Sequence, residues 1–270
     1  MKFRFLNPYT YITGIILLIT LAISWFFWSG AFEIITMNLD APDLKGVNPH
    51  TFRLGLFSSI LTWERFVLSS VGYSLDFIPI LVILPAIGFI NRMQMVKDFA
   101  LTKIKSIPRY LAKEVFLQGT VSALLTSLTF TIFYSIGGLF ITKNTFTEIY
   151  FFKDLLPLGF YNQHPYLTFM IMIWTVYFLF AFTLNILACC LGLLIEKKYL
   201  VLLTTYLVVS IASLSANYLF HNESLSPYTM LLSFEKEATT LTNFLPLCYL
   251  LPICLVFFIM GIKKWQNEVK

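Results

Sequence analysis

Apolar and polar residues follow each other along this chain in long blocks. Six blocks carry almost no charge, and all but the second reach the length of about 18 apolar residues that a membrane-spanning helix needs. The blocks cover residues 11–30, 75–90, 115–141, 167–195, 199–220 and 244–262. The pattern predicts an all-α polytopic membrane protein with six transmembrane helices, folded as a single transmembrane domain over residues 1–270.

The second block is short and contains Pro79 and Pro85. Proline removes a backbone donor and kinks a helix, and inside a membrane the neighbouring helices must then satisfy the freed carbonyl groups. We therefore expect a bent helix that packs inside the bundle. A kink without any gating role is the simpler interpretation.

Composition agrees with a membrane protein. Hydrophobic residues make up 58% of the chain and charged residues 12%, which is about half the charged share of a soluble domain. The first block follows a basic N-terminus, as a signal peptide does. It ends in the bulky Trp25 and Trp28 with no small-residue cleavage site, so we expect an uncleaved first span.

The positive charges predict the orientation. If the N-terminus is cytoplasmic, 13 of the 19 Lys and Arg residues fall in cytoplasmic segments and 6 in outer ones. The positive-inside rule favours this arrangement. It predicts a multi-pass protein of the cell membrane with both termini in the cytoplasm.

Six of these basic residues lie between Arg92 and Lys113, between the second and third spans. The segment contains an apolar stripe at helical spacing, formed by Val96, Phe99, Ala100 and Ile104. Three lysines lie off this stripe: Lys97, Lys103 and Lys105. Ser106 and Pro108 then suit the start of a new helix. The pattern predicts an amphipathic cytoplasmic helix that docks on anionic lipid or on a protein partner. The simpler alternative is that these charges only set the topology.

Three segments resemble the permeases of type-2 ABC transporters. The first is "IKSIPRYLAKEV" (Ile104–Val115), which is similar to the family's entry into the third span. The second is "LGLLIEKKYLVLLTTYL" (Leu191–Leu207), two spans joined by a tight basic turn. The third is "LSPYTMLLSF" (Leu225–Phe234), where the family has short outer helices before its last span. The outer loop Ala31–Ser74 is longer than the resemblance predicts.

The resemblance implies the membrane subunit of an ATP-driven exporter for an amphiphilic substrate such as a peptide, a lipid-linked glycan or a drug. A separate ABC ATPase would dock on the cytoplasmic helix, and the permease would work as a homodimer or with a paralogous permease. The docking residues would be Val96, Lys97, Phe99, Lys103, Ile104, Lys105 and Arg109. The sequence has no G-x-x-x-x-G-K-[ST] phosphate loop, so ATP hydrolysis is expected on the partner chain.

The third span carries one face of polar residues: Gln118, Ser122, Thr126 and Thr129. Such a face usually forms interhelical hydrogen bonds and allows close packing. The functional alternative is a translocation path or a dimer seam.

Other chemistry has little support in the sequence. The three histidines and four cysteines show no metal-ligand or disulfide spacing,. No ionisable residue lies near the middle of a predicted span, which disfavours an ion-coupled carrier. We expect no catalytic residue, cofactor or metal on this chain, and membrane lipids rather than nucleic acid as further partners. An integral-membrane enzyme or an ion-coupled carrier remains the alternative.

Overall fold

The computed structural model describes residues 7–38, 48–99, 106–141, 156–157, 159–234 and 242–269. The regular elements within these residues are helices, and six helical segments are long and apolar enough to cross a membrane. The chain is therefore an all-α, multi-pass membrane protein, which confirms the predicted fold class.

The spans agree with the predicted blocks. The first is α1 (Pro8–Trp28), and the second consists of α5 (Phe77–Ile83) and α6 (Ala86–Phe99). The third is α7 (Ile107–Gly138). The fourth joins α9 (Pro165–Met172), the π-helix η3 (Ile173–Tyr177) and α10 (Phe178–Leu194). The fifth and sixth are α11 (Lys198–Tyr218) and α12 (Leu247–Val269).

The second and third spans extend further than their apolar blocks predict. The second continues to Phe99, and the third begins at Ile107. Hydropathy marks only the part of a helix that lies in apolar surroundings, whereas helix formation continues through "NRMQMVKDF", which contains no Gly or Pro. Ser106 precedes the first residue of α7 in an extended conformation and Pro108 lies in its first turn, as predicted. The Ser106 side chain makes no capping hydrogen bond.

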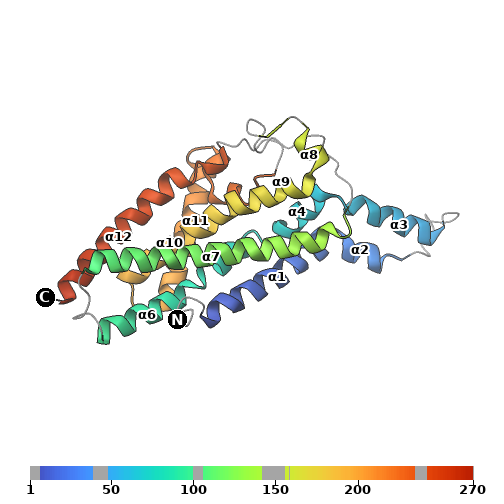
Figure 1. The fold of residues 1–270 in the computed structure, drawn as a ribbon. Coiled ribbons are helices and arrows are strands. Elements are labelled where there is room, and N and C mark those ends of the chain that lie inside the picture. Colours follow the sequence, from blue (N-terminus) through green and yellow to red (C-terminus); the bar gives the residue numbers. More distant parts are fainter. Residues whose placement is uncertain are drawn as a thin grey trace.

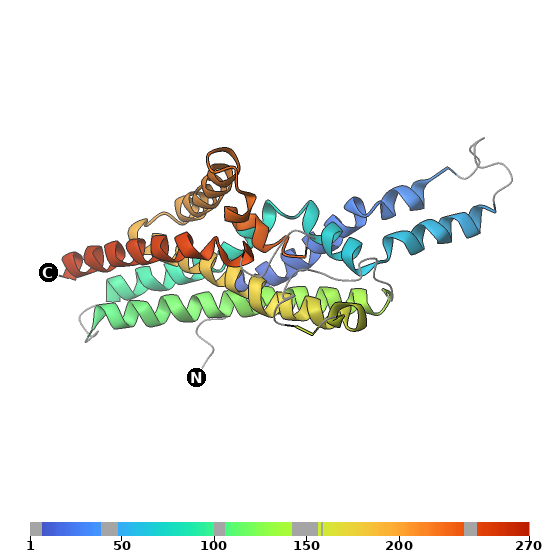
Figure 2. The same ribbon diagram turned by 90° about the horizontal axis from the view of Figure 1, so that it is seen from above.

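The spans divide into an inner and an outer group. The fourth, second and third spans have 72%, 61% and 50% of their apolar windows buried within the chain. The first, fifth and sixth have only 28%, 28% and 22%. Within the described chain α10 is central, with contacts to α5, α6, α7, α11 and α12, and Figures 1 and 2 show α7 running alongside the fourth span. The outer group therefore offers its apolar faces to lipid or to another subunit.

In the predicted outer loop Ala31–Ser74, the described residues form three helices: α2 (Ala31–Thr36), α3 (Pro49–Ile60) and α4 (Trp63–Gly72). α2 and α3 project beyond the spans in both views (Figures 1 and 2). By contrast, α4 is largely buried and packs against α1, where the Ser24 hydroxyl donates to the carbonyl oxygen of Ser69 at 2.8 Å. Part of the long loop thus belongs to the bundle.

Short helices also occur before the last span, as expected for "LSPYTMLLSF". They are the 3-10 helices η4 (Glu223–Leu225), η5 (Pro227–Met230) and η6 (Thr242–Phe244). The Ser226 hydroxyl accepts from the main-chain N–H of Tyr228 at 3.4 Å, and Pro227 begins η5. A small helix, α8 (Phe160–Gln163), precedes the fourth span.

The π-helix η3 widens the fourth span by one residue where it meets α7. The carbonyl oxygen of Ile173 accepts from the Ser127 hydroxyl at 3.4 Å. At the other end of the turn, the hydroxyl of Tyr177 donates to the carbonyl oxygen of Leu231 at 2.9 Å. The ring of Tyr177 lies 4.8 Å, centroid to centroid, from that of Phe130. Hydrogen bonds and an aromatic contact therefore hold this irregular turn between α7 and the segment after η5.

Candidate functional site

The basic end of the bundle is the end where α6 and α12 finish, α7 begins, and a tight turn joins α10 to α11. Eight described basic residues lie there: Arg92, Lys97, Arg109, Lys113, Lys197, Lys198, Lys263 and Lys264. Figure 1 shows the C-terminal end of α12 beside the ends of α6 and α7. The structure thus brings together charges that lie on three separate parts of the sequence.

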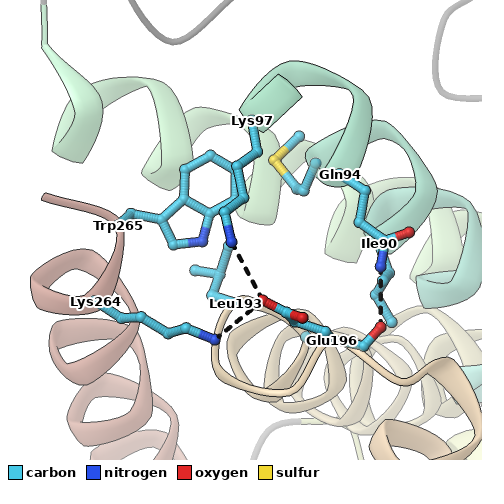
Figure 3. Close-up of a pocket in the computed structure, with 9 residues that line it drawn as sticks. Ile90, Gln94, Lys97, Leu193, Glu196, Lys264 and Trp265 are labelled. Carbon is cyan, nitrogen blue, oxygen red and sulfur yellow. Dashed lines mark hydrogen bonds and ion pairs between the residues drawn. The ribbon is translucent and has the colours of Figure 1, made fainter. Parts of the chain in front are cut away.

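A cavity of about 310 Å³ opens at this end between α6, the α10–α11 turn and α12. Nine residues line it: Ile90, Met93, Gln94, Lys97, Gly192, Leu193, Glu196, Lys264 and Trp265. Its charged centre is the carboxylate of Glu196 (Figure 3). Oε1 of this carboxylate lies 3.2 Å from Nζ of Lys97 and 3.8 Å from Nζ of Lys264. One carboxylate therefore links the second span to the sixth.

Side-chain donors that bond main-chain carbonyl groups also hold this turn in place. The amide of Gln94 donates to the carbonyl oxygen of Glu196 at 2.9 Å, and Nζ of Lys264 donates to the carbonyl oxygen of Leu194 at 2.9 Å. Leu194 is the last residue of α10, where carbonyl groups lack helical partners and a positive charge is favourable. These two bonds fix the turn without using the Glu196 carboxylate.

The two lysines favour the ionised form of Glu196. The hydrogen bond from Lys97 lowers the pKa of the Glu196 carboxyl most, and the charges of Lys97 and Lys264 lower it further. Its side chain is 67% exposed, whereas those of Lys97 and Lys264 are 30% and 33% exposed. The site therefore combines an exposed carboxylate with two lysine side chains that are each about two-thirds buried.

A second polar site surrounds the break between α5 and α6, at Leu84 and Pro85. The carbonyl oxygen of Val82 accepts from the Ser122 hydroxyl at 3.0 Å and from the Asn185 amide at 3.1 Å. The amide of Gln118 donates to the carbonyl oxygen of Pro85 at 3.3 Å. The third and fourth spans thus satisfy carbonyl groups at the break, as expected for a bent second span.

The break is connected to the basic end through Gln118. Its side-chain oxygen accepts from Nη2 of Arg92 at 2.9 Å, and the same guanidinium lies 3.7 Å from Oε2 of Glu114. The Arg92 and Glu114 side chains are only 16% and 13% exposed. The sequence analysis assigned Arg92 to the cytoplasmic segment between the second and third spans, but its side chain lies inside the bundle between α6 and α7.

The predicted polar face of the third span is buried within the chain. Exposure is 5% or less for all four residues: Gln118, Ser122, Thr126 and Thr129. Gln118 and Ser122 bind the second span, and the Thr129 hydroxyl donates to the carbonyl oxygen of Leu125 at 2.9 Å. In this conformation the face serves helix packing and is covered by neighbouring helices.

The predicted docking residues are only partly described. Val96 and Lys97 lie in α6, which runs without interruption to Phe99, so they continue the second span and do not begin a new helix. Val96 packs partly against the core, and Lys97 lines the cavity. Arg109 is exposed in the first turn of α7. The Phe99 side chain and residues Lys103, Ile104 and Lys105 lie outside the described structure, and a separate coupling helix stays a prediction.

At the opposite end, α4 carries a buried acid that the sequence analysis did not identify. Glu64 is 6% exposed, and its Oε1 accepts a hydrogen bond from the hydroxyl of Tyr161 at 2.7 Å. Burial raises the pKa of Tyr161, and the hydrogen bond to Glu64 raises it further. The only sequence signal was an acidic residue in the first turn after Thr62, before an apolar run.

No group of three or more His, Cys, Asp or Glu side chains in the described residues is arranged to hold a metal ion. The three histidines are exposed, and the four cysteines are free.

Comparison with models of protein families, with curated proteins and with solved structures finds no match to this chain. The functional assignment therefore depends on the geometry of the two polar sites and on the pattern of the sequence.

Proposed function

We propose that this chain is the permease subunit of an ATP-driven exporter in the cell membrane, with a separate ATPase subunit bound at the basic end. The observation that carries the proposal is the link through Glu196. This carboxylate connects Lys97 near the end of α6 to Lys264 near the end of α12. A partner that moves the end of α6 would therefore displace the α10–α11 turn and α12 together.

The sequence supports a separate energy source, since it contains no phosphate-binding loop,. The distribution of charge supports a cytoplasmic position for the basic end and for both termini. Among the described Lys and Arg residues, only Arg53 and Arg65 lie away from this end. A cytoplasmic ATPase would thus meet a concentrated positive surface, which speeds encounter with an acidic partner.

A second copy or a paralogous permease would complete the transporter. The apolar faces of α1, α11 and α12 are available for this contact, and they include Ile15, Ile211 and Leu255, at 61%, 59% and 59% exposed. Because Gln118 and Ser122 bind the second span, a path along the third span would need the second span to move away first. We propose that ATP-driven motion at the basic end produces this opening for an amphiphilic substrate.

Co-purification with an ABC ATPase, sought among the genes beside the one for this chain, tests the proposal. Phe99→Ala should reduce ATPase retention more than Lys103→Ala, because a buried aromatic anchor contributes about 2 kcal/mol or more to binding and an exposed ion pair about 1 kcal/mol or less. A triple variant with alanine at Lys97, Lys103 and Lys105 should weaken association mainly at low salt.

Two results would reject this assignment. One is a wild-type protein that retains no ATPase in mild detergent. The other is a Phe99→Ala variant that retains as much as the wild type. If the charges only set the topology, Phe99→Ala would have no effect, and the triple variant would invert or scramble the spans.

One observation favours a second candidate, an ion-coupled carrier. The second span is broken within the bundle at Leu84 and Pro85, between α5 and α6. Broken spans supply cation-binding carbonyl groups in several carriers. Transport by the purified chain in liposomes, driven by a sodium or proton gradient with no ATPase present, would establish this alternative and exclude the exporter.

A further inference from the structure

The cavity at the basic end contains both signs of charge at close range. Two ammonium groups, from Lys97 and Lys264, converge on one oxygen of Glu196. The volume of about 310 Å³ is at the lower end of the range for small-molecule sites, about 300–1,000 Å³. It suits a small charged group better than a whole amphiphile.

The walls of the cavity combine this charge with apolar surface. Ile90, Met93 and Leu193 line it from α6 and α10, and the Trp265 ring lies beside Lys97 in Figure 3. Lys264 and Trp265 are near the end of the sixth span. Lysine and tryptophan at the end of a span are typical of the level of the lipid head groups.

We propose that this cavity binds the head group of an aminophospholipid, with its phosphate on Lys97 and Lys264 and its primary ammonium on Glu196. The recognised chemistry is a phosphate ester joined to a primary amine, as in phosphoethanolamine. The acyl chains would lie along the apolar surface of the sixth span on the side of Lys264, which exposes Val256 and Met260 at 56% and 49%. The ligand would belong to the leaflet at the basic end.

The charges explain why an aminophosphate fits better than a simple anion. A phosphate that approached Lys97 and Lys264 would compete with Glu196 for both cations and leave its carboxylate without them. A head group with its own ammonium replaces the lost partner, so the number of ion pairs is maintained. A quaternary choline carries the same charge but has no N–H to donate to the carboxylate.

The turn can accept this exchange without losing its anchorage. The bonds from Gln94 to Glu196 and from Lys264 to Leu194 end on main-chain oxygens. The Glu196 side chain is 67% exposed and can rotate toward a ligand ammonium. The surrounding exposed lysines, among them Lys197 and Lys263, add the positive field that draws a phosphate to this end,.

Native mass spectrometry of the lipid-stripped protein in mild detergent tests the site. Synthetic phosphatidylethanolamine, phosphatidylglycerol and phosphatidylcholine of the same acyl length are added separately. Wild type should retain phosphatidylethanolamine about two- to fivefold better than either other lipid, the ratio expected from ion pairs of about 1 kcal/mol or less. Equal retention of the three lipids would overturn the proposal.

Substitutions in the cavity test whether the preference for phosphatidylethanolamine arises there. Lys264→Gln and Lys97→Gln should each lower retention of phosphatidylethanolamine. Glu196→Gln should remove the preference over phosphatidylglycerol and keep phosphate binding. The matched control is Lys263→Gln, which removes an exposed neighbouring lysine that does not line the cavity and should behave as wild type. If the preference persists in Glu196→Gln and in both lysine variants, the lipid binds elsewhere and the proposal is wrong.

Two further measurements distinguish a bound lipid from a soluble ligand and from the ATPase as the occupant of the cavity. Soluble phosphoethanolamine should bind more weakly than the lipid, because it lacks the acyl chains; equal affinity would identify a soluble ligand and reject a lipid. ATPase retention is measured on the same variants. If they lose the ATPase and keep the lipid preference, the cavity is a protein contact and the lipid proposal fails.

Discussion

The side-chain amide of Asn185 donates a hydrogen bond to the carbonyl oxygen of Val82, 3.1 Å away and 103 residues distant in the chain. Both residues are fully buried. The same oxygen accepts from Ser122, so donors from the third and fourth spans meet at the break in the second. This is the point at which the three inner spans are connected by polar contacts.

We predict that removing these donors destabilises the bundle more than additively. Asn185→Leu and Ser122→Ala should each cost about 0.5–2 kcal/mol, the range for hydrogen bonds between membrane helices. The double variant should cost more than the sum, because both side-chain donors to Val82 are then gone. Equilibrium unfolding in mixed micelles measures the free energy of unfolding of each variant. Thr120→Val, which removes a hydroxyl that bonds within α7, is the control. Strict additivity would show that the two donors act independently.

A close contact between α4 and α7 gives a second prediction. A Cβ atom added at Gly137 would overlap the ring of Phe66, which is 5% exposed and lies 5.1 Å, centroid to centroid, from Phe133. Gly137→Ala should therefore destabilise the protein by about 1–3 kcal/mol, as overpacking does. Thermal unfolding followed by size exclusion measures the loss.

Two further variants check this explanation. Phe66→Leu should recover part of the stability lost in Gly137→Ala, since it removes the clashing ring. Gly55→Ala is the control, because a Cβ there meets nothing within 4 Å and should stabilise α3 by about 0.5–1 kcal/mol. A Gly137→Ala protein as stable as wild type would show that α4 can move away from α7.

The charge pairs of Glu196 predict a pH dependence. Its carboxyl has a lowered pKa in the folded state, so its contribution to stability is fully present above the ordinary value near 4.5 and is lost as the pH falls through the folded-state pKa. The melting temperatures of wild type and Glu196→Gln should therefore differ by a constant amount from pH 7 to pH 5.5. The difference should shrink only below pH 4.5. A difference that already disappears near pH 6 would contradict the assigned pairs.

The orientation can be tested by labelling from outside intact cells. Single cysteines at Asn48, Asn144 and Asn222, in a background without the four native cysteines, should react with an impermeant thiol reagent. Cysteines at Gln94 and Gln266, at the basic end, should react only after permeabilisation. Of these two, Gln266 is the cleaner site, because Gln94 donates to Glu196. Labelling of Gln266 in intact cells would reverse the proposed orientation.

The spans could be predicted because each depends on a local property, a run of apolar residues. The bend at Pro85 and its need for outside donors were predictable for the same reason. Which residues would act as these donors was only partly predictable from the sequence. Gln118 and Ser122 were recognised as part of a polar face on the third span. Whether that face packs against another span or lines a translocation path depends on how the helices pack. Asn185 as a partner of Val82 could be found only in three dimensions.

The cavity was harder to predict because its charges come from three span ends that each look ordinary. Lys97, Glu196 and Lys264 gain a shared function only when α6, the α10–α11 turn and α12 meet. α4 was missed because Glu64 and Arg65 interrupt its hydropathy, although the helix is mostly buried. The burial of Glu64 beside Tyr161 likewise depends on contact with a distant segment.

The π-helix at Ile173–Tyr177 has a consequence for how this protein tolerates changes in length. A π turn absorbs one surplus residue locally, so deleting a residue there would convert the turn to ordinary α-helix and leave α9 and α10 facing as before. Asn185 would keep its position opposite Val82. The loss would fall on Tyr177, which would no longer reach the carbonyl oxygen of Leu231. Relatives that lack this residue could thus share the bundle and differ only where η3 meets the segment after η5.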